Sequence, residues 1–279
     1  MGNINQRLWA AARSGSEAEL KALLRNPGCD PLAKNYRGMT SLMLAAYHGH
    51  KACLQMLLPI SDALAKGDDG ITALMYAAYN GHETCVRILL PKSNAKSKGE
   101  DGATALMYAS GKGHTTCVEL LLQASDALSK DESGCTALMK AASSGCVAAV
   151  PLLLPVSDAL DQCKTGWTAL MDAAYKGHEA CVRSLLPVSN ALSKATDGRT
   201  ALMAAASYGH EACVRLLLPQ SDAHEKSVHG LTASGYARKG GYEFLSQFID
   251  NYVLSQNEHI SIDSAVGSEA PRGRAAPRV

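Results

Sequence analysis

The chain repeats itself every 32 residues, and this period limits the folds open to it more than any other feature. Gly recurs at that spacing from Gly38 to Gly230, and a Thr follows two residues after each of these glycines. Near copies of one line surround each Thr, as in GITALMYAAYNGHETCVRILLP and GWTALMDAAYKGHEACVRSLLP. A period of about 20–50 residues is typical of proteins that stack one small structural unit many times. We therefore expect a solenoid.

Each unit carries the signals of two short helices. Thr72 is a good N-cap for the first helix, because its hydroxyl can accept a hydrogen bond from an unpaired amide of the first turn. Gly81 ends that helix nine residues later. A second helix is predicted from about residue 83 to residue 90, where Pro91 cannot continue it.

The two faces of the first helix differ in character. Leu74, Ala77 and Ala78 share one face at 100° per residue, whereas Tyr76 and Tyr79 lie on the opposite face. Helices this short do not fold alone, because nucleation is costly and a narrow apolar stripe buries little area. The units must therefore stack on their neighbours.

The pattern G-x-T-A-L-M-x-A-A-x-x-G-H-x-x-C-V-x-x-L-L resembles the ankyrin repeat, in which a hairpin or β-turn precedes two antiparallel helices. The resemblance extends over residues 5 to about 254. Two features depart from the family: Thr-Ala-Leu-Met replaces Thr-Pro-Leu-His, and the period is 32 instead of 33. The resemblance implies an all-α repeat fold, an ankyrin solenoid of helix-turn-helix units with short hairpin or turn fingers.

The repeats divide the chain into eight units and a tail. The predicted divisions are an N-terminal capping unit at 1–37, six regular units at 38–229, a C-terminal capping unit at 230–254 and a disordered tail at 255–279. The tail is rich in Ser, Pro, Gly and Arg, a composition that buries little apolar surface. Phe244 and Phe248 are expected to form a bulky plug at the end of the stack.

Unit 5, at 134–165, is the irregular member. Pro151 stands where the other regular units have Arg, Glu or, in one case, Gln55, and it removes a helical donor and crowds the carbonyl four residues earlier. The sequence predicts a distorted or late-starting second helix there.

Composition excludes several classes of protein. A net charge of +1, from 27 basic and 26 acidic residues, gives no broad positive field for a phosphate backbone. No segment approaches the roughly 18 unbroken apolar residues that a bilayer span requires, and the first residues lack a secretory signal. The nine cysteines are expected as free thiols. We expect a cytoplasmic protein with no nucleic-acid or membrane partner, and export as an effector stays open.

A repeated His-x-x-Cys resembles half of a zinc site. The pairs are His50 with Cys53, His82 with Cys85, His114 with Cys117, His178 with Cys181, and His210 with Cys213. Packed helices lie about 8–10 Å apart whereas a Zn–S bond is about 2.3 Å, so pairs from successive units are not expected to combine. We expect these cysteines in the core and these histidines to cap or bridge loops between units. No cofactor, metal or small-molecule substrate is predicted.

The positions that vary from unit to unit predict where a partner protein binds. In the ankyrin family such positions form the finger tips and the concave groove, and aromatic side chains with a polar tip are favoured interface anchors. The predicted partner-binding residues are Met39, Tyr47, Asp68, Asp69, Ile71, Tyr76, Tyr79, Glu100, Asp101, Tyr108, Trp167, Tyr175, Arg199 and Tyr208. Acidic tips at these fingers, and at Asp131 and Glu132, would attract a basic partner.

Several interpretations follow from this pattern. The first is a non-enzymatic scaffold that binds a protein or peptide on its groove and finger tips. The second is an effector or immunity protein of the ankyrin type that inhibits or relocates a partner enzyme. The third and least favoured is an enzyme that uses an exposed thiol, for which Cys135 and Cys163 are the candidates. A further alternative is that the tyrosines only pack against neighbouring helices and that the acidic residues are a solvated edge.

Overall fold

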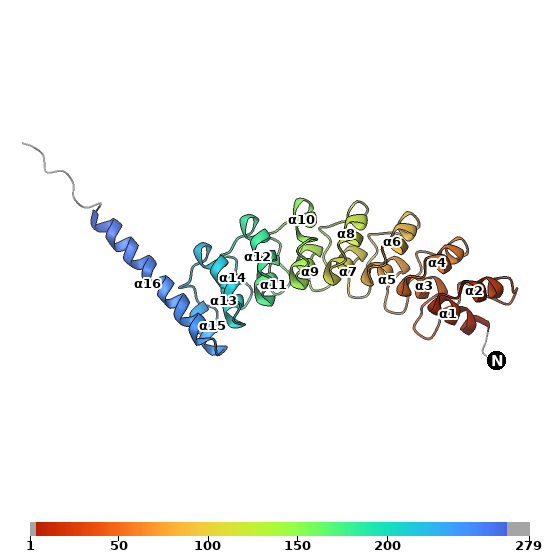
Figure 1. Cartoon of the computed structure of the whole chain (residues 1–279), viewed down its shortest axis with the longest axis horizontal. Helices are drawn as coiled ribbons and strands as arrows, with labels where there is room; N and C mark the ends of the chain where they lie inside the picture. Colours follow the sequence, from red (N-terminus) through yellow and green to blue (C-terminus); the bar gives the residue numbers. More distant parts are fainter. Residues whose placement is uncertain (1–3, 267–279) are drawn as a thin grey trace, which may run out of the picture.

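The computed structural model of the chain describes residues 4–266, and over that range it is an elongated stack of helix pairs (Figure 1). The first helices of the units are α1 (Ile4–Ser14), α3 (Ser41–His48), α5 (Ala73–Tyr79), α7 (Ala105–Lys112), α9 (Ala137–Ser144), α11 (Ala169–Lys176), α13 (Ala201–Ser207) and α15 (Ala233–Lys239). The second helices are α2 (Glu17–Leu24), α4 (Lys51–Leu57), α6 (Glu83–Leu89), α8 (Thr115–Leu122), α10 (Val150–Leu153), α12 (Glu179–Leu185), α14 (Glu211–Leu217) and α16 (Glu243–Val266). The predicted all-α repeat fold is confirmed.

The first helix of each regular unit begins and ends as predicted. The hydroxyl of Thr72 accepts a hydrogen bond from the amide of Met75 at 3.3 Å, and the same bond recurs at the Thr of every later unit. Gly81 then adopts a φ of 73°, a left-handed conformation that glycine reaches without steric cost. This turn reverses the chain within three residues and sets α6 antiparallel to α5.

The second helix ends where proline stops it. The α-helix α6 ends at Leu89, and one 3-10 turn (Leu90–Lys92) follows with Pro91 in its first turn. The Asn94 side chain then accepts a hydrogen bond from the amide of Lys96 at 3.0 Å, which turns the chain toward the next finger. The fingers, defined as the turns centred on each recurring Gly such as Gly70, are turns without strand in the part of the chain that the structure describes.

The core runs through the whole stack. Leu74, Ala77 and Ala78 of α5 are buried as predicted, and so is Cys85 of α6, the member of the His-x-x-Cys pair in this unit. Each first helix packs on the first helix of the next unit, and most second helices do likewise, from α2 to α8 and from α10 to α14. The buried side chains of neighbouring units therefore form one continuous core.

Side chains and fingers also tie each unit to the next. Lys66 donates a hydrogen bond to the carbonyl of Lys98 at 2.7 Å, and Lys34 and Lys98 make the equivalent bond one unit before and after. In the fingers, the amide of Glu100 donates to the carbonyl of Asp69 at 3.1 Å. These contacts fix the spacing between units.

Unit 5 differs from the others as the sequence predicts. Its second helix, α10, is only four residues long and begins at Val150, three residues later in the unit than α4 or α6. Pro151 lies in the first turn of α10, where its missing amide leaves no intrahelical bond unmade. The prediction of a late-starting helix is confirmed.

The C-terminal end differs from two predictions. Helix α16 continues to Val266, twelve residues beyond the predicted end of the last unit at 254, because no Pro or Gly interrupts the sequence before Gly267. The predicted plug is only partial. Phe248 packs against the core beneath Arg215, whose guanidinium lies 4.1 Å from the ring centroid, but Phe244 is 72% exposed because no further unit covers it. Residues 267–279 of the predicted tail lie outside the described residues.

Candidate protein-binding groove

A groove of about 440 Å³ opens over the first helices and fingers of units 2 to 4. We call it the tyrosine groove, and its lining residues are Tyr47, Asp69, Ile71, Met75, Tyr76, Tyr79, Glu100, Asp101 and Tyr108. Eight of these nine residues are among the predicted partner-binding positions. The ninth, Met75, lies buried in α5, and the helical pattern of the sequence gave no reason to place it in a groove.

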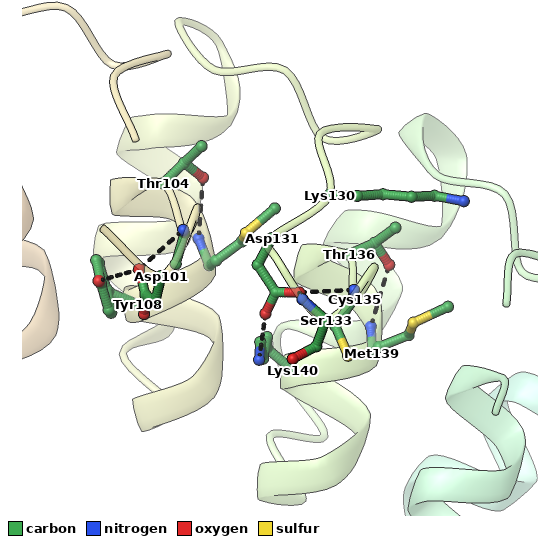
Figure 2. Close-up of polar contacts among 12 residues, drawn as sticks. Asp101, Thr104, Tyr108, Lys130, Asp131, Ser133, Cys135, Thr136, Met139 and Lys140 are labelled. Atoms are coloured by element: carbon green, nitrogen blue, oxygen red, sulfur yellow. Dashed lines mark hydrogen bonds and ion pairs between the residues drawn. The ribbon is translucent and has the colours of Figure 1, made fainter. Parts of the chain in front are cut away.

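Two tyrosines of the groove are fixed to the fingers by hydrogen bonds. Tyr76 donates its hydroxyl proton to Oδ2 of Asp69 at 2.7 Å. Tyr108 donates in the same way to Oδ1 of Asp101 at 2.8 Å, as Figure 2 shows. Burial, followed by these bonds to carboxylates, raises the pKa of both tyrosines well above the ordinary value. The two hydroxyls therefore stay protonated, and their hydrogen bonds hold the rings against the fingers.

The other two tyrosines are the exposed ones. Tyr47 meets Tyr76 edge to face with 5.6 Å between ring centroids, and Tyr79 meets Tyr108 in the same way at 6.0 Å. Tyr47 and Tyr79 are each 38% exposed. The ammonium of Lys112 lies 4.5 Å from the centroid of the Tyr79 ring, so this ring already accepts a cation.

The repeated histidines hold the main chain beneath these rings. Nε2 of His82 lies 3.0 Å from the carbonyl oxygen of Tyr47, and Nε2 of His114 lies 3.1 Å from that of Tyr79. A carbonyl oxygen can only accept, so Nε2 carries the proton in each case. The prediction that these histidines bridge units is confirmed.

The acidic residues around the groove fall into distinct environments. Glu100 is exposed, and its carboxylate makes no hydrogen bond or ion pair with the described residues. Asp68 is also exposed but lies outside the lining of the groove. The groove itself is lined by three carboxylates and by no basic residue.

Asp131 corrects the expectation of an acidic tip in the fourth finger. Its side chain is only 6% exposed and forms an ion pair with Nζ of Lys140 at 2.6 Å (Figure 2). It also accepts hydrogen bonds from the amides of Ser133 and Cys135. Asp131 is therefore a neutralised structural residue, whereas its neighbour Glu132 is exposed.

The remaining predicted aromatic residues form a second cluster in units 6 and 7. This tryptophan cluster consists of Trp167, Tyr175, Arg199 and Tyr208. Tyr175 lies edge to face with Trp167 at 5.3 Å and with Tyr208 at 4.5 Å, and the two tyrosine hydroxyls are 3.1 Å apart. Apart from Met39 and Asp68, the predicted binding residues are thus divided between two sites, one on each side of unit 5.

Comparison with protein families decides what kind of chain this is. A model described as ankyrin repeats (3 copies) matches at residues 8–99, 60–131, 89–159, 124–191, 150–229 and 188–257, which together cover most of the chain. The chain belongs to the ankyrin-repeat family. No match was found among the curated proteins. Ankyrin repeats generally serve as protein–protein interaction modules, so both aromatic sites of this ankyrin protein lie on a scaffold suited to holding a partner.

One predicted contact residue of the ankyrin surface is placed elsewhere. Met39 is 7% exposed and belongs to the core, so the prediction that it contacts a partner is corrected. Its amide and carbonyl both bond to Asn35, which closes the first finger.

Several cysteines of this ankyrin protein, those of the core and Cys135, lie in environments that disfavour a reactive thiolate. Burial raises the pKa of Cys85 to about 11, and burial together with Asp131 raises that of Cys135 to about 12. Cys163 is half-buried, with its Sγ 3.0 Å from the hydroxyl of Thr165. Among the side chains that the structure describes, at residues 4–256, no three His, Cys, Asp or Glu converge as metal ligands would. Among the helices of residues 4–266, none combines the length and apolar character that a membrane crossing demands.

Proposed function

We propose that this ankyrin protein is a non-enzymatic scaffold that binds a partner protein along the tyrosine groove and the tryptophan cluster. The observation that carries the proposal is the tyrosine groove, in which four tyrosines and three carboxylates line an open surface and two of the tyrosines are fixed by hydrogen bonds to Asp69 and Asp101. Aromatic anchors that are already ordered lose little entropy on binding, so such a surface binds efficiently.

The partner is a protein rather than a nucleic acid or a small substrate. Three carboxylates in the groove would repel a phosphate backbone, and an open groove excludes little water from a reaction. The free cysteines support a reducing compartment such as the cytoplasm. An effector that inhibits a partner enzyme would use the same surface, and assaying the captured partner for loss of activity separates that role from simple scaffolding.

The test is affinity capture with the tagged full-length chain. The triple variant Tyr79→Ala, Trp167→Ala, Tyr175→Ala should lose the proteins that the wild type retains, while circular dichroism shows an unchanged helical fold. Phe244→Ala is the matched control, since it removes an equally bulky exposed ring that lies outside both sites. Retention of the same proteins by the triple variant would contradict the proposal.

A further inference from the structure

We propose that the tyrosine groove binds one arginine side chain from an extended segment of the partner protein. The inference rests on the proposed function and names what the groove recognises. It depends on three observations: unused carboxylate oxygens, an aromatic face that accepts a cation, and an arginine that already fills the equivalent place elsewhere in the chain.

The third finger offers carboxylate oxygens that nothing in the described chain uses. Asp101 accepts the Tyr108 hydroxyl and the amide of Ala103 through Oδ1 alone, which leaves Oδ2 unbonded. The Glu100 carboxylate beside it has no partner among the described residues. Asp69, by contrast, uses both of its oxygens, for Ile71 and Tyr76. The free acceptors are thus concentrated at Glu100 and Asp101.

In the tryptophan cluster, an arginine of this chain, Arg199, already occupies the position next to the equivalent carboxylate. Asp197 stands 96 residues, or three repeats, after Asp101, and its Oδ1 accepts the amide of Arg199 just as Asp101 accepts that of Ala103. Oδ2 of Asp197 then accepts Nε of Arg199 at 2.6 Å, and the guanidinium lies 5.2 Å from the centroid of the Trp167 ring.

The tyrosine groove has the same carboxylate arrangement without the arginine, and Ile71 stands at the position of Trp167, so the aromatic faces of the groove come from its tyrosines instead. Ala103 occupies the position of Arg199, so Oδ2 of Asp101 receives no guanidinium from its own chain. The ring of Tyr79 accepts the Lys112 ammonium on one side, which shows that aromatic faces here attract cations. An arginine from outside would take the place that Arg199 takes three units later.

Guanidinium fits this site better than other cations. Its planar fork can donate to two carboxylates at once and stack on a ring, which suits Asp101, Glu100 and the tyrosines. Lysine brings a compact ammonium that can approach only as a point charge. A trimethylated lysine has no N–H donor and would leave the oxygens of Glu100 and Asp101 unpaired.

The test uses full-length protein labelled with ¹³C at the methyl groups of isoleucine and methionine, because Ile71 and Met75 both line the groove. Nuclear magnetic resonance titrations compare twelve-residue peptides of Gly, Ser and Ala that carry one central Arg, Lys, asymmetric dimethylarginine or trimethyllysine. The Arg peptide should shift the Ile71 and Met75 methyl signals and bind tightest. Dimethylation of the arginine keeps its charge but blocks bidentate hydrogen bonding by the guanidinium, so it should weaken binding.

Three variants locate the site. Glu100→Gln should weaken binding of the Arg peptide roughly tenfold, the effect expected for loss of one charged hydrogen bond. Glu132→Gln is the matched control, because Glu132 is the equivalent finger-tip residue one unit later and lies outside the groove lining. Ala103→Arg should abolish binding by supplying an internal guanidinium to Asp101, with the methyl spectrum confirming the fold.

Each other outcome overturns the inference. Equal affinity for Arg and Lys would reduce the groove to a general acidic surface, and tighter binding of trimethyllysine would make it a cage for methylated ammonium. Methyl shifts that depend on protein concentration without peptide would make a second copy of this chain the occupant, through Arg272, Arg274 or Arg278. Absence of peptide binding, with partner capture still lost in the Tyr79, Trp167 and Tyr175 variant, would refute the arginine site and leave the scaffold proposal standing.

Discussion

The imidazole of His114 in unit 4 donates a hydrogen bond to the main-chain carbonyl of Tyr79 in unit 3, at 3.1 Å. The ring also packs closely over Gly81, since a Cβ added to that glycine would lie 2.5 Å from Nδ1 of the histidine. An exposed tyrosine of the binding surface is therefore positioned by the unit that follows it.

Replacing this histidine should loosen the stack. His114→Ala removes the hydrogen bond and should lower the free energy of unfolding by about 1 kcal/mol. Urea denaturation followed by circular dichroism measures the change. His224→Ala is the control, because the exposed His224 ring makes no hydrogen bond with the described residues and its loss should have a negligible effect. A similar loss in both variants would contradict the structural role of His114.

Unit 5 allows the reverse experiment. Cys146 stands where the other regular units have this histidine, and its Sγ makes only a long contact of 3.6 Å with the hydroxyl of Thr115. Cys146→His should restore a bond to the carbonyl of residue 111 and raise the free energy of unfolding by about 0.5–1 kcal/mol. A lower urea midpoint would show that the shortened helix α10 holds residue 146 out of register.

Lys140 and Asp131 form an ion pair in which the carboxylate is buried, and its disruption should be costly. Lys140→Ala leaves the Asp131 carboxylate, 6% exposed, without its counter-charge, and the free energy of unfolding should fall by about 2–4 kcal/mol. Lys130→Ala breaks the more exposed ion pair between Nζ of Lys130 and Oδ1 of Asp161, which are 2.7 Å apart. This variant should lower the free energy of unfolding by no more than about 1 kcal/mol. Equal effects of the two variants in urea denaturation would mean that Asp131 is not effectively buried.

Asp172 should make the stability of the fold depend on pH. Burial raises its pKa from 3.8 to about 6, although the nearby Lys140 and Lys176 oppose the shift. Because the pKa is higher in the folded state, folding favours the protonated form, and the free energy of unfolding falls as pH rises from about 4 to about 6. Asp172→Asn removes this penalty and should be more stable than the wild type by about 1–3 kcal/mol at pH 7.5.

The pH series distinguishes this effect from a general gain. At pH 4 the Asp172→Asn variant and the wild type should have nearly the same urea midpoint, since the carboxyl is already largely protonated in the fold. Asp68→Asn, which alters an exposed carboxylate without hydrogen bonds or ion pairs to the described residues, is the matched control. A stabilisation by Asp172→Asn that is equal at pH 4 and pH 7.5 would refute a titration of Asp172.

Much of the fold could be predicted because its determinants are local and recur in every unit. The Thr72 cap, the left-handed Gly81 and the stop at Pro91 each act within a few residues of chain. Pro151 likewise acts on its own turn, so the late start of α10 was predictable. Most of the tyrosine groove was predictable because its residues vary from unit to unit while the rest of the repeat stays constant.

The remaining features depend on contacts that local patterns do not describe. Asp131 is neutralised by Lys140 across the turn from finger to helix, and only the replacement of a tyrosine by Lys140 at the position of Tyr108 signals it. The exposure of Phe244 depends on the absence of a covering unit, since its apolar character alone predicts burial. The burial of Met39 is not signalled by its place in the repeat, since Ile71 at the same place in the next unit lines the groove.

The lysine contacts between units have a consequence for the length of the protein. Lys34, Lys66 and Lys98 each bond to the carbonyl of the residue 32 positions ahead, which is itself the next lysine of the series or Lys130. Deleting residues 70–101 as a block would bring Lys66 next to the carbonyl of Lys130 in the same geometry. This series of lysine hydrogen bonds therefore does not depend on the number of units. Whole repeats can be gained or lost by recombination while the contacts between the remaining units are kept.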